Sequence, residues 1–209
     1  MSLPSRLLGA NPSIQVSTLL SGSLSTPSAK GAFVSFAPAS FESIATVVVG
    51  AGGQNTIQFN SIPSTFTHLQ LRYASRDSRA GSTDAPVDLT FNGNTSAIYS
   101  KSYIQADGTT SAAGSEVNQT YLRLEGSGNG GLGSTFSIGI TDIIDYTSST
   151  KTKSVMQIVG VEKNASGGFV RFQTGQWYNT SPITSITLTP FSAPFLQYSH
   201  FALYGIKGS

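Results

Sequence analysis

His68-Leu69-Gln70-Leu71-Arg72-Tyr73 is the stretch that decides the fold. Its apolar and polar residues alternate, so an extended strand formed here has one apolar face and one polar face. This pattern is typical of an antiparallel sheet that is covered by other structure on one side only. The same alternation recurs far away in the chain, in His200–Ile206. The two stretches together predict a fold dominated by β-strands.

Period-two patterns continue through most of the chain from Phe41 onward, and no segment shows a sustained helical period with caps. Turn sequences such as Asn92-Gly93 and Asp107-Gly108 separate them. We therefore expect an all-β protein whose domain is an antiparallel, jelly-roll-like β-sandwich. The expected strands are 42–49, 56–59, 68–74, 87–91, 99–105, 120–124, 135–140, 153–162, 169–174, 184–188 and 200–206.

The segment 1–40 differs in composition from the rest. It holds four of the nine prolines and two charged residues, Arg6 and Lys30. Prolines at this spacing interrupt both helices and strand ladders. We expect an extended docking arm over 1–40, followed by the sandwich domain over 41–209; the alternative is a segment that folds back on its own domain. The candidate docking residues are the apolar Leu7, Leu8, Leu19, Leu20 and Phe33.

The composition also restricts the possible partners. Charged residues are 11% of the chain, against about 25% in an ordinary soluble domain. The formal net charge is +2, and the basic residues are scattered. We therefore expect no nucleic-acid partner, because such a groove needs many phosphate contacts. The absence of cysteine excludes disulfides and thiolate metal sites.

The first residues, Met1–Gly9, lack the continuous apolar core of a signal peptide. Nor does the sequence contain a run of about 18 apolar residues that could cross a membrane. We therefore expect no membrane insertion, and the absence of cysteine is compatible with folding in a reducing cytoplasm.

Three patterns resemble catalytic or metal sites, and each has a simpler interpretation. Gly128–Gly133 matches the letters of a dinucleotide fingerprint but lies between two expected strands, without the helix that would bind a pyrophosphate. Asp142 and Asp145 could form a glycosidase pair, but three residues apart they more naturally accept backbone N–H bonds in a turn. His68 and His200 lack a second ligand at metal-binding spacing. We expect no enzyme, no cofactor and no bound metal.

Glycan binding is left open by the composition. Trp177 and Tyr178 stand next to the polar Asn179, near the end of an expected strand, where a sugar ring could stack on an aromatic face. The alternative is that Trp177 fills the sandwich core or a subunit interface, because large aromatic residues dominate both.

Five stretches together resemble a known domain: Phe41-Glu42-Ser43-Ile44-Ala45-Thr46, Ile62–Arg72, Phe91-Asn92-Gly93-Asn94, Ile143-Ile144-Asp145-Tyr146 and Gln197–Lys207. They are similar to a β domain found, alone or appended to longer chains, in virion proteins of tailed bacteriophages. The resemblance covers about residues 41 to 208. The resemblance implies no catalytic residues, and members of this group are structural or tail-associated proteins.

The resemblance implies a structural protein of the virion. Such a protein decorates the capsid or forms a short tail appendage, and is assembled in the host bacterial cytoplasm. The arm lies outside the shared domain, and we expect it to anchor the protein to other virion proteins. Low charge density and many apolar strand positions predict a homo-oligomer, and we expect a homotrimer. The alternative is a receptor-binding module at a tail-fibre tip, in which Trp177, Tyr178 and Asn179 contact host surface glycan.

Overall fold

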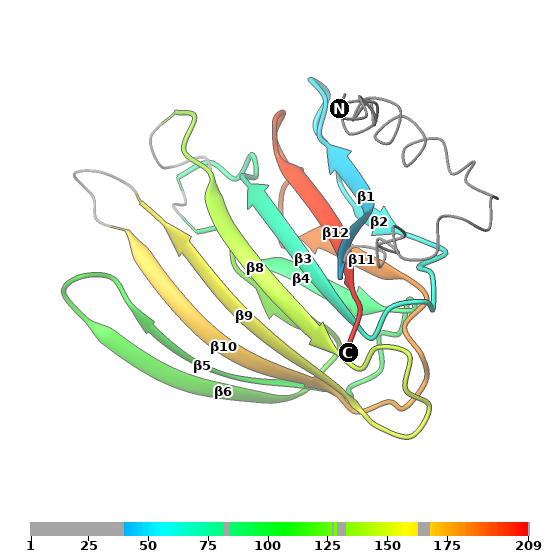
Figure 1. Ribbon diagram of the computed structural model, residues 1–209. Helices are drawn as coiled ribbons and strands as arrows, with labels where there is room; N and C mark the ends of the chain where they lie inside the picture. The colour runs from blue at the N-terminus through cyan, green and yellow to red at the C-terminus, as the bar shows by residue number, and fades with distance from the viewer. Residues whose placement is uncertain (1–39, 82–83, 127, 129–132, 163–167, 209) are drawn as a thin grey trace, which may run out of the picture. The chain divides into compact units, whose positions relative to one another are not determined.

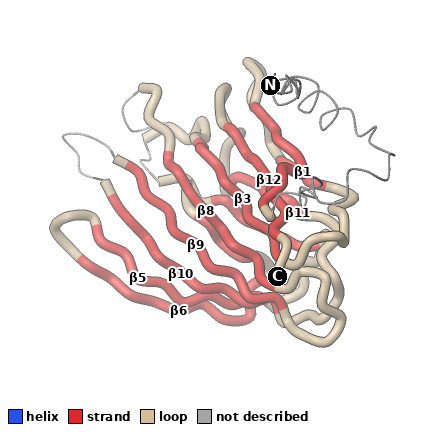
Figure 2. Tube along the Cα trace, viewed as in Figure 1, coloured by secondary structure: helices blue, strands red, loops and turns tan. Residues whose placement is uncertain are grey.

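The computed structural model describes residues 40–81, 84–126, 128, 133–162 and 168–208. Within these ranges the chain forms twelve β-strands and no helix (Figures 1 and 2). The all-β class expected from the alternating pattern is therefore confirmed. The strands are β1 (Phe41–Val48), β2 (Ile57–Phe59), β3 (His68–Ser75), β4 (Val87–Phe91), β5 (Tyr99–Ala106), β6 (Ser111–Gln119), β7 (Leu122–Leu124), β8 (Ser137–Ile144), β9 (Lys153–Val161), β10 (Phe169–Trp177), β11 (Ile186–Pro190) and β12 (His200–Ile206).

The predicted docking residues Leu7, Leu8, Leu19, Leu20 and Phe33 lie outside the described residues, so the docking arm stays a prediction. The residues from Ser40 onward form a unit of their own. In the part of the chain that is described, no helix long and apolar enough to cross a bilayer occurs.

The strands form two sheets, and within each sheet every pair of neighbouring strands is antiparallel. The larger sheet has eight strands in the order β1-β12-β3-β8-β9-β10-β5-β6, and the smaller has four in the order β2-β11-β4-β7. This arrangement is a β-sandwich, as expected. The strand order does not confirm jelly-roll connectivity, which stays a prediction.

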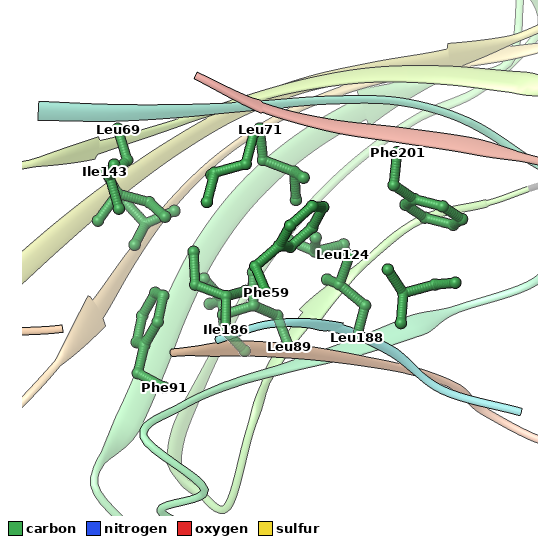
Figure 3. Packing of buried hydrophobic residues seen from close by; sticks show 14 of the residues in the cluster. Phe59, Leu69, Leu71, Leu89, Phe91, Leu124, Ile143, Ile186, Leu188 and Phe201 are labelled. Atoms are coloured by element: carbon green, nitrogen blue, oxygen red, sulfur yellow. The ribbon is translucent and has the colours of Figure 1, made fainter. Parts of the chain in front are cut away.

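The hydrophobic core lies between the two sheets (Figure 3). Leu69 and Leu71 of β3 point from the large sheet toward Leu89 of β4 and Leu188 of β11 in the small one. Each of these four leucines is fully buried, and burial of such a side chain stabilises a fold by about 1.5–3 kcal/mol. The alternation in His68–Tyr73 therefore predicted the inner face of β3 correctly.

All eleven strands expected from the sequence are present, with ends shifted by up to four residues. The twelfth, β6, was missed. It is rich in serine, alanine and glycine, which have low β-propensity. Its pairing with β5 along Ser111–Gln119 makes it a strand all the same. Here tertiary context overrides local preference, and β6 forms one edge of the large sheet.

Candidate assembly surface

The predicted glycan residues do not form one exposed site. Trp177 is only 1% exposed and packs against Phe91 and Tyr99, with ring centroids 5.4 and 6.2 Å away. Its indole face cannot stack on a sugar, so the interpretation of Trp177 as a glycan contact is wrong and its role in the core is confirmed. Tyr178 is 58% exposed, and its hydroxyl accepts a hydrogen bond from Ser100 Oγ at 3.2 Å. Asn179 is half-buried, and its Oδ1 caps the Ser181 N–H at 2.8 Å.

The two aspartates considered for catalysis bind other side chains. Asp142 lies within β8, where its Oδ1 accepts a hydrogen bond from Gln70 Nε2 at 2.7 Å. Asp145 follows the strand, and its Oδ2 accepts from Lys151 Nζ at 2.7 Å, which lowers the pKa of its carboxyl. Among the described residues neither carboxylate accepts a turn N–H, and the hydrogen bonds seen instead come from the side chains of Gln70 and Lys151. Their engagement with Gln70 and Lys151 supports a structural role.

His68 also has a structural contact, because its Nδ1 accepts the backbone N–H of Asp145 at 3.0 Å. Among the described residues, no group of three His, Cys, Asp or Glu is arranged to hold a metal ion. Most of the glycine-rich segment Gly128–Gly133 lies outside the described residues, so its predicted role as a hairpin loop stays a prediction.

A different surface stands out on the outer face of the large sheet, the face turned away from the small sheet. Exposed apolar side chains from four adjacent strands lie there, and we call six of them, which stand in two neighbouring rows, the apolar stripe. Their exposed fractions range from 39% for Phe172 to 67% for Ile138. The stripe comprises Ile138 and Ile140 of β8, Ile158 of β9, Val170 and Phe172 of β10, and Ile104 of β5.

The strand register places these side chains in neighbouring positions. Ile140 pairs with Ile158, Ile158 with Phe172, and Phe172 with Ile104. The row then continues from Ile104 to Ala113 on β6. Because residues paired across adjacent strands point to the same face, this row is a continuous apolar band across five strands.

A second row runs beside the first and contains a gap. Ile138 pairs with Gly160, which pairs with Val170. Gly160 carries no side chain, and the nearest atom that a Cβ there would meet is the Phe169 carbonyl oxygen at 3.5 Å. A groove of about 640 Å³ lies here, lined by residues of β3, β8, β9 and β10, and a second one of about 430 Å³ lies between β10, β5 and β6. Val170 borders both grooves.

No charged residue belongs to the stripe. Arg72 lies at its border on β3, where its Nε donates to Gln70 Oε1 at 2.7 Å and its guanidinium lies over the Phe41 ring. Glu162 lies at the other border, just after β9. A charge-free apolar centre with a polar border is the usual composition of a protein–protein interface.

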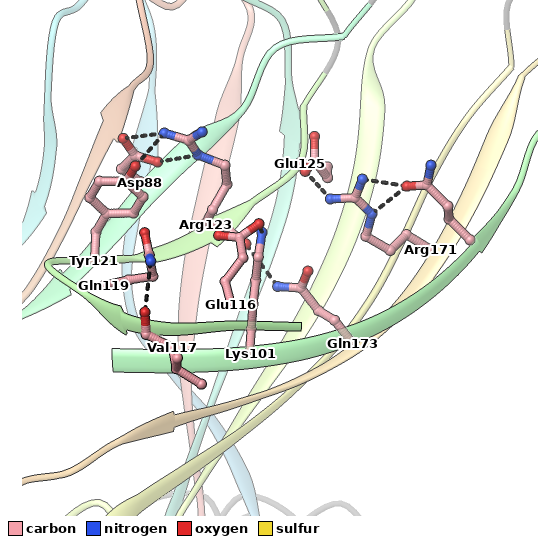
Figure 4. A network of polar contacts seen from close by, with 11 residues as sticks. Asp88, Lys101, Glu116, Val117, Gln119, Tyr121, Arg123, Glu125, Arg171 and Gln173 are labelled. Carbon is pink, nitrogen blue, oxygen red and sulfur yellow. Dashed lines mark hydrogen bonds and ion pairs between the residues drawn. The ribbon is translucent and has the colours of Figure 1, made fainter. Parts of the chain in front are cut away.

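The opposite face of the same strands is buried, and it carries a layer of polar side chains beside apolar core residues such as Ile143 and Val159. Glu125 forms an ion pair with Arg171 of β10, and Lys101 of β5 forms one with Glu116 of β6 at 3.3 Å (Figure 4). Burial raises the pKa of the Glu125 carboxyl, which Arg171 offsets only in part. Burial likewise lowers the pKa of the Lys101 ammonium.

Two glutamines continue this polar layer. Gln157 Nε2 donates to Tyr73 Oη at 2.7 Å, and Gln173 Nε2 donates to the Arg123 carbonyl oxygen at 2.9 Å. Thr141 of β8 pairs with Gln157, and Gln157 pairs with Gln173, so the three form one buried polar row. In this part of the sheet the polar Thr141, Gln157 and Gln173 face inward, and the apolar Ile140, Ile158 and Phe172 beside them face outward.

The stripe was not predicted from the sequence. Alternation in Ser137–Ile144 is plain, and the apolar character of Ile138 and Ile140 favours a core-facing position for them. The structure instead buries the serine, glycine and threonine between and beside them. The sequence signal for such a face lies in Phe169–Trp177, where the polar Arg171 and Gln173 alternate with the apolar Val170 and Phe172.

Comparison of the chain with protein-family models, with curated proteins and with solved structures finds no match.

Proposed function

We propose that this protein is a structural component of a tailed-bacteriophage particle, either a capsid decoration or a short tail appendage. Its copies associate as a homotrimer, and its arm, residues 1–40, anchors it to other virion proteins. The role in a particle rests on the resemblance of residues 41–208 to virion β domains. The role in assembly rests on one observation, the charge-free apolar stripe on the outer face of the large sheet.

The stripe supports assembly because its exposure is costly in water. Fully burying one such side chain stabilises a protein by about 1.5–3 kcal/mol. The six side chains are roughly half exposed, so covering them contributes on the order of 5 kcal/mol per copy. In an isolated domain such a patch stays exposed to water, whereas in a subunit of an assembly a neighbouring chain can cover it.

The contacts of the aspartates support a non-catalytic role. Gln70 and Lys151 occupy the carboxylates that a hydrolase would need for acid and base chemistry. The pKa of the Glu125 carboxyl is raised because Glu125 is buried, and Arg171 pairs with it. That ion pair lies inside the sandwich, where a structural role explains it.

An asymmetric cryo-electron microscopy reconstruction of purified particles, combined with quantitative mass spectrometry, tests the proposal. Hundreds of copies on the shell indicate a capsid decoration, and multiples of three or six near the tail indicate an appendage. Density confined to a distal fibre tip would favour host-glycan recognition instead. Gradient-purified particles that contain none of this chain would overturn the proposal.

A further inference from the structure

The side chains of the main row of the stripe differ in size in an ordered way. From β8 to β6 the row reads Ile140, Ile158, Phe172, Ile104 and Ala113. The largest side chain, Phe172, stands on β10, the middle strand of the five (Figure 1). The smallest, Ala113, stands on the edge strand β6.

The dimensions of the row restrict what can cover it. Five strands at about 4.8 Å spacing make a band about 24 Å wide. Two such bands packed flat lie about 10 Å apart, so each contributes a layer about 5 Å thick everywhere. A flat pair therefore favours facing side chains whose combined size is the same along the row. The observed row rises to phenylalanine in the middle.

Three bands arranged as the sides of a triangle require a different order of side-chain sizes along the row. A triangle with sides of about 24 Å places its centre about 7 Å from the middle of each side. The middle strand then requires the longest apolar side chain, and the space narrows toward each corner. At each corner β8 of one copy meets β6 of the next, so Ile138 and Ile140 face the small Ser111 and Ala113. Large residues packed against small ones fill such a space without voids.

We propose that three copies of this chain pack the outer faces of β8, β9, β10, β5 and β6 around a three-fold axis, with Phe172 nearest the axis. This inference rests on the proposed role in assembly and names the contact that the assembly uses. The stripe brings no charge to the axis, so the three copies bury no unpaired charge there. The corners also cover β6, an edge strand that would otherwise stay open to pairing.

Sedimentation equilibrium of the full chain at micromolar concentration provides the first test. We expect a trimer for the wild type and a monomer for Phe172→Glu, because three carboxylates would meet in an apolar space. The matched control is Phe191→Glu. Phe191 is 52% exposed and follows β11 of the small sheet, and it lies over Arg123, so this variant should stay a trimer. A monomeric or dimeric wild type, or dissociation of both variants alike, would overturn the inference.

A designed metal site tests the position of the axis. Phe172→His places three imidazoles around the axis, and three histidines with a water are a known zinc site. We expect this variant to bind one Zn²⁺ per three chains in equilibrium dialysis, and its melting temperature to rise with added zinc sulfate. Phe191→His should show neither effect. Two results would place the axis elsewhere. One is a Phe172→His variant that is trimeric but binds no zinc. The other is a Phe172→His variant that is monomeric and stays so when zinc is added.

The two proposals fail in different ways. A chain that forms this trimer but is absent from particles contradicts the virion role and leaves the trimer standing. A chain present in particles but monomeric in solution contradicts the trimer contact alone.

Discussion

Gln157 and Ile158 are neighbours on β9, yet the amide side chain is 1% exposed and the isoleucine is 54% exposed. Gln173 and Phe172 on β10 show the same reversal, at 1% and 39%. On β3, by contrast, Leu69 and Leu71 are buried and the polar residues between them face outward. The eight-stranded sheet thus contains one region with an ordinary apolar interior and one region whose interior includes a layer of polar side chains.

The difference shows that each region packs against a different kind of neighbour. The inner face of β3 packs against apolar strands of the small sheet. The inner face of β10 and β5 packs against β7. Two polar residues lie there, Arg123 of β7 and Glu125, which directly follows β7. There, hydrogen bonds and ion pairs engage Gln157, Gln173, Glu125 and Lys101, and the apolar Ile104 and Phe172 face outward.

The largest effect on stability is expected when the two faces of β8 are compared. Ile143→Ala removes a fully buried side chain of β8 and should lower the free energy of unfolding by about 2–5 kcal/mol. Ile138→Ala removes a side chain that is 67% exposed and should cost less than about 1 kcal/mol. Both are to be measured by urea unfolding in the Phe172→Glu background, where association does not contribute. Equal costs would mean that the two faces do not differ in burial.

Glycines on the two faces give the next largest effect. A Cβ on Gly139, on the inner face, would lie 2.3 Å from Tyr73 Cζ, so Gly139→Ala should cost about 1–3 kcal/mol through overpacking. Gly160 on the outer face has its nearest such contact at 3.5 Å. Gly160→Ala should be neutral or stabilise by up to about 1 kcal/mol, since alanine restricts the unfolded chain. Thermal unfolding of the two variants checks the order, and a costly Gly160→Ala would contradict it.

The buried carboxyl of the polar layer should make stability depend on pH. Because burial raises the pKa of Glu125 above its ordinary value of 4.5, the folded chain holds this proton more tightly than the unfolded chain. The resulting stability is complete below pH 4.5 and is lost as the pH rises through the folded pKa. Glutamine resembles the protonated acid and does not titrate. Relative to Glu125→Gln, the wild type should therefore lose melting temperature as the pH rises from 4 to 8; a constant difference would show that burial does not control this group.

The smallest effect is expected at the exposed end of β8. Asp145 has a positive φ of 50°, a conformation that asparagine tolerates and alanine does not. Asp145→Asn should therefore change the melting temperature less than Asp145→Ala, although both lose the ion pair with Lys151. The reverse order would mean that the charge on Asp145 matters more than its backbone. Loss of an activity in Asp145→Asn without a change in melting temperature would instead indicate a catalytic role.

Local pattern predicted most of the strands because alternation is a property of the chain itself. Leu69, Leu71 and Tyr73 could be assigned to a buried face in advance, and so could the antiparallel sandwich. The strand β6 could not be predicted, because Ser111–Gln119 has little intrinsic preference for extended structure. Its pairing with β5 is a long-range contact that no short window of sequence contains.

The stripe was hidden for a related reason. Alternation divides the residues of Ser137–Ile144 into two faces but does not say which face another layer will cover. That depends on where β7 and the small sheet lie, and hence on contacts between residues far apart in the chain. The sequence by itself therefore determined most of the strands and their two-sided character. Only the tertiary structure decided that Phe172 and its neighbours face outward, because burial is a property of the packed layers and not of any single strand.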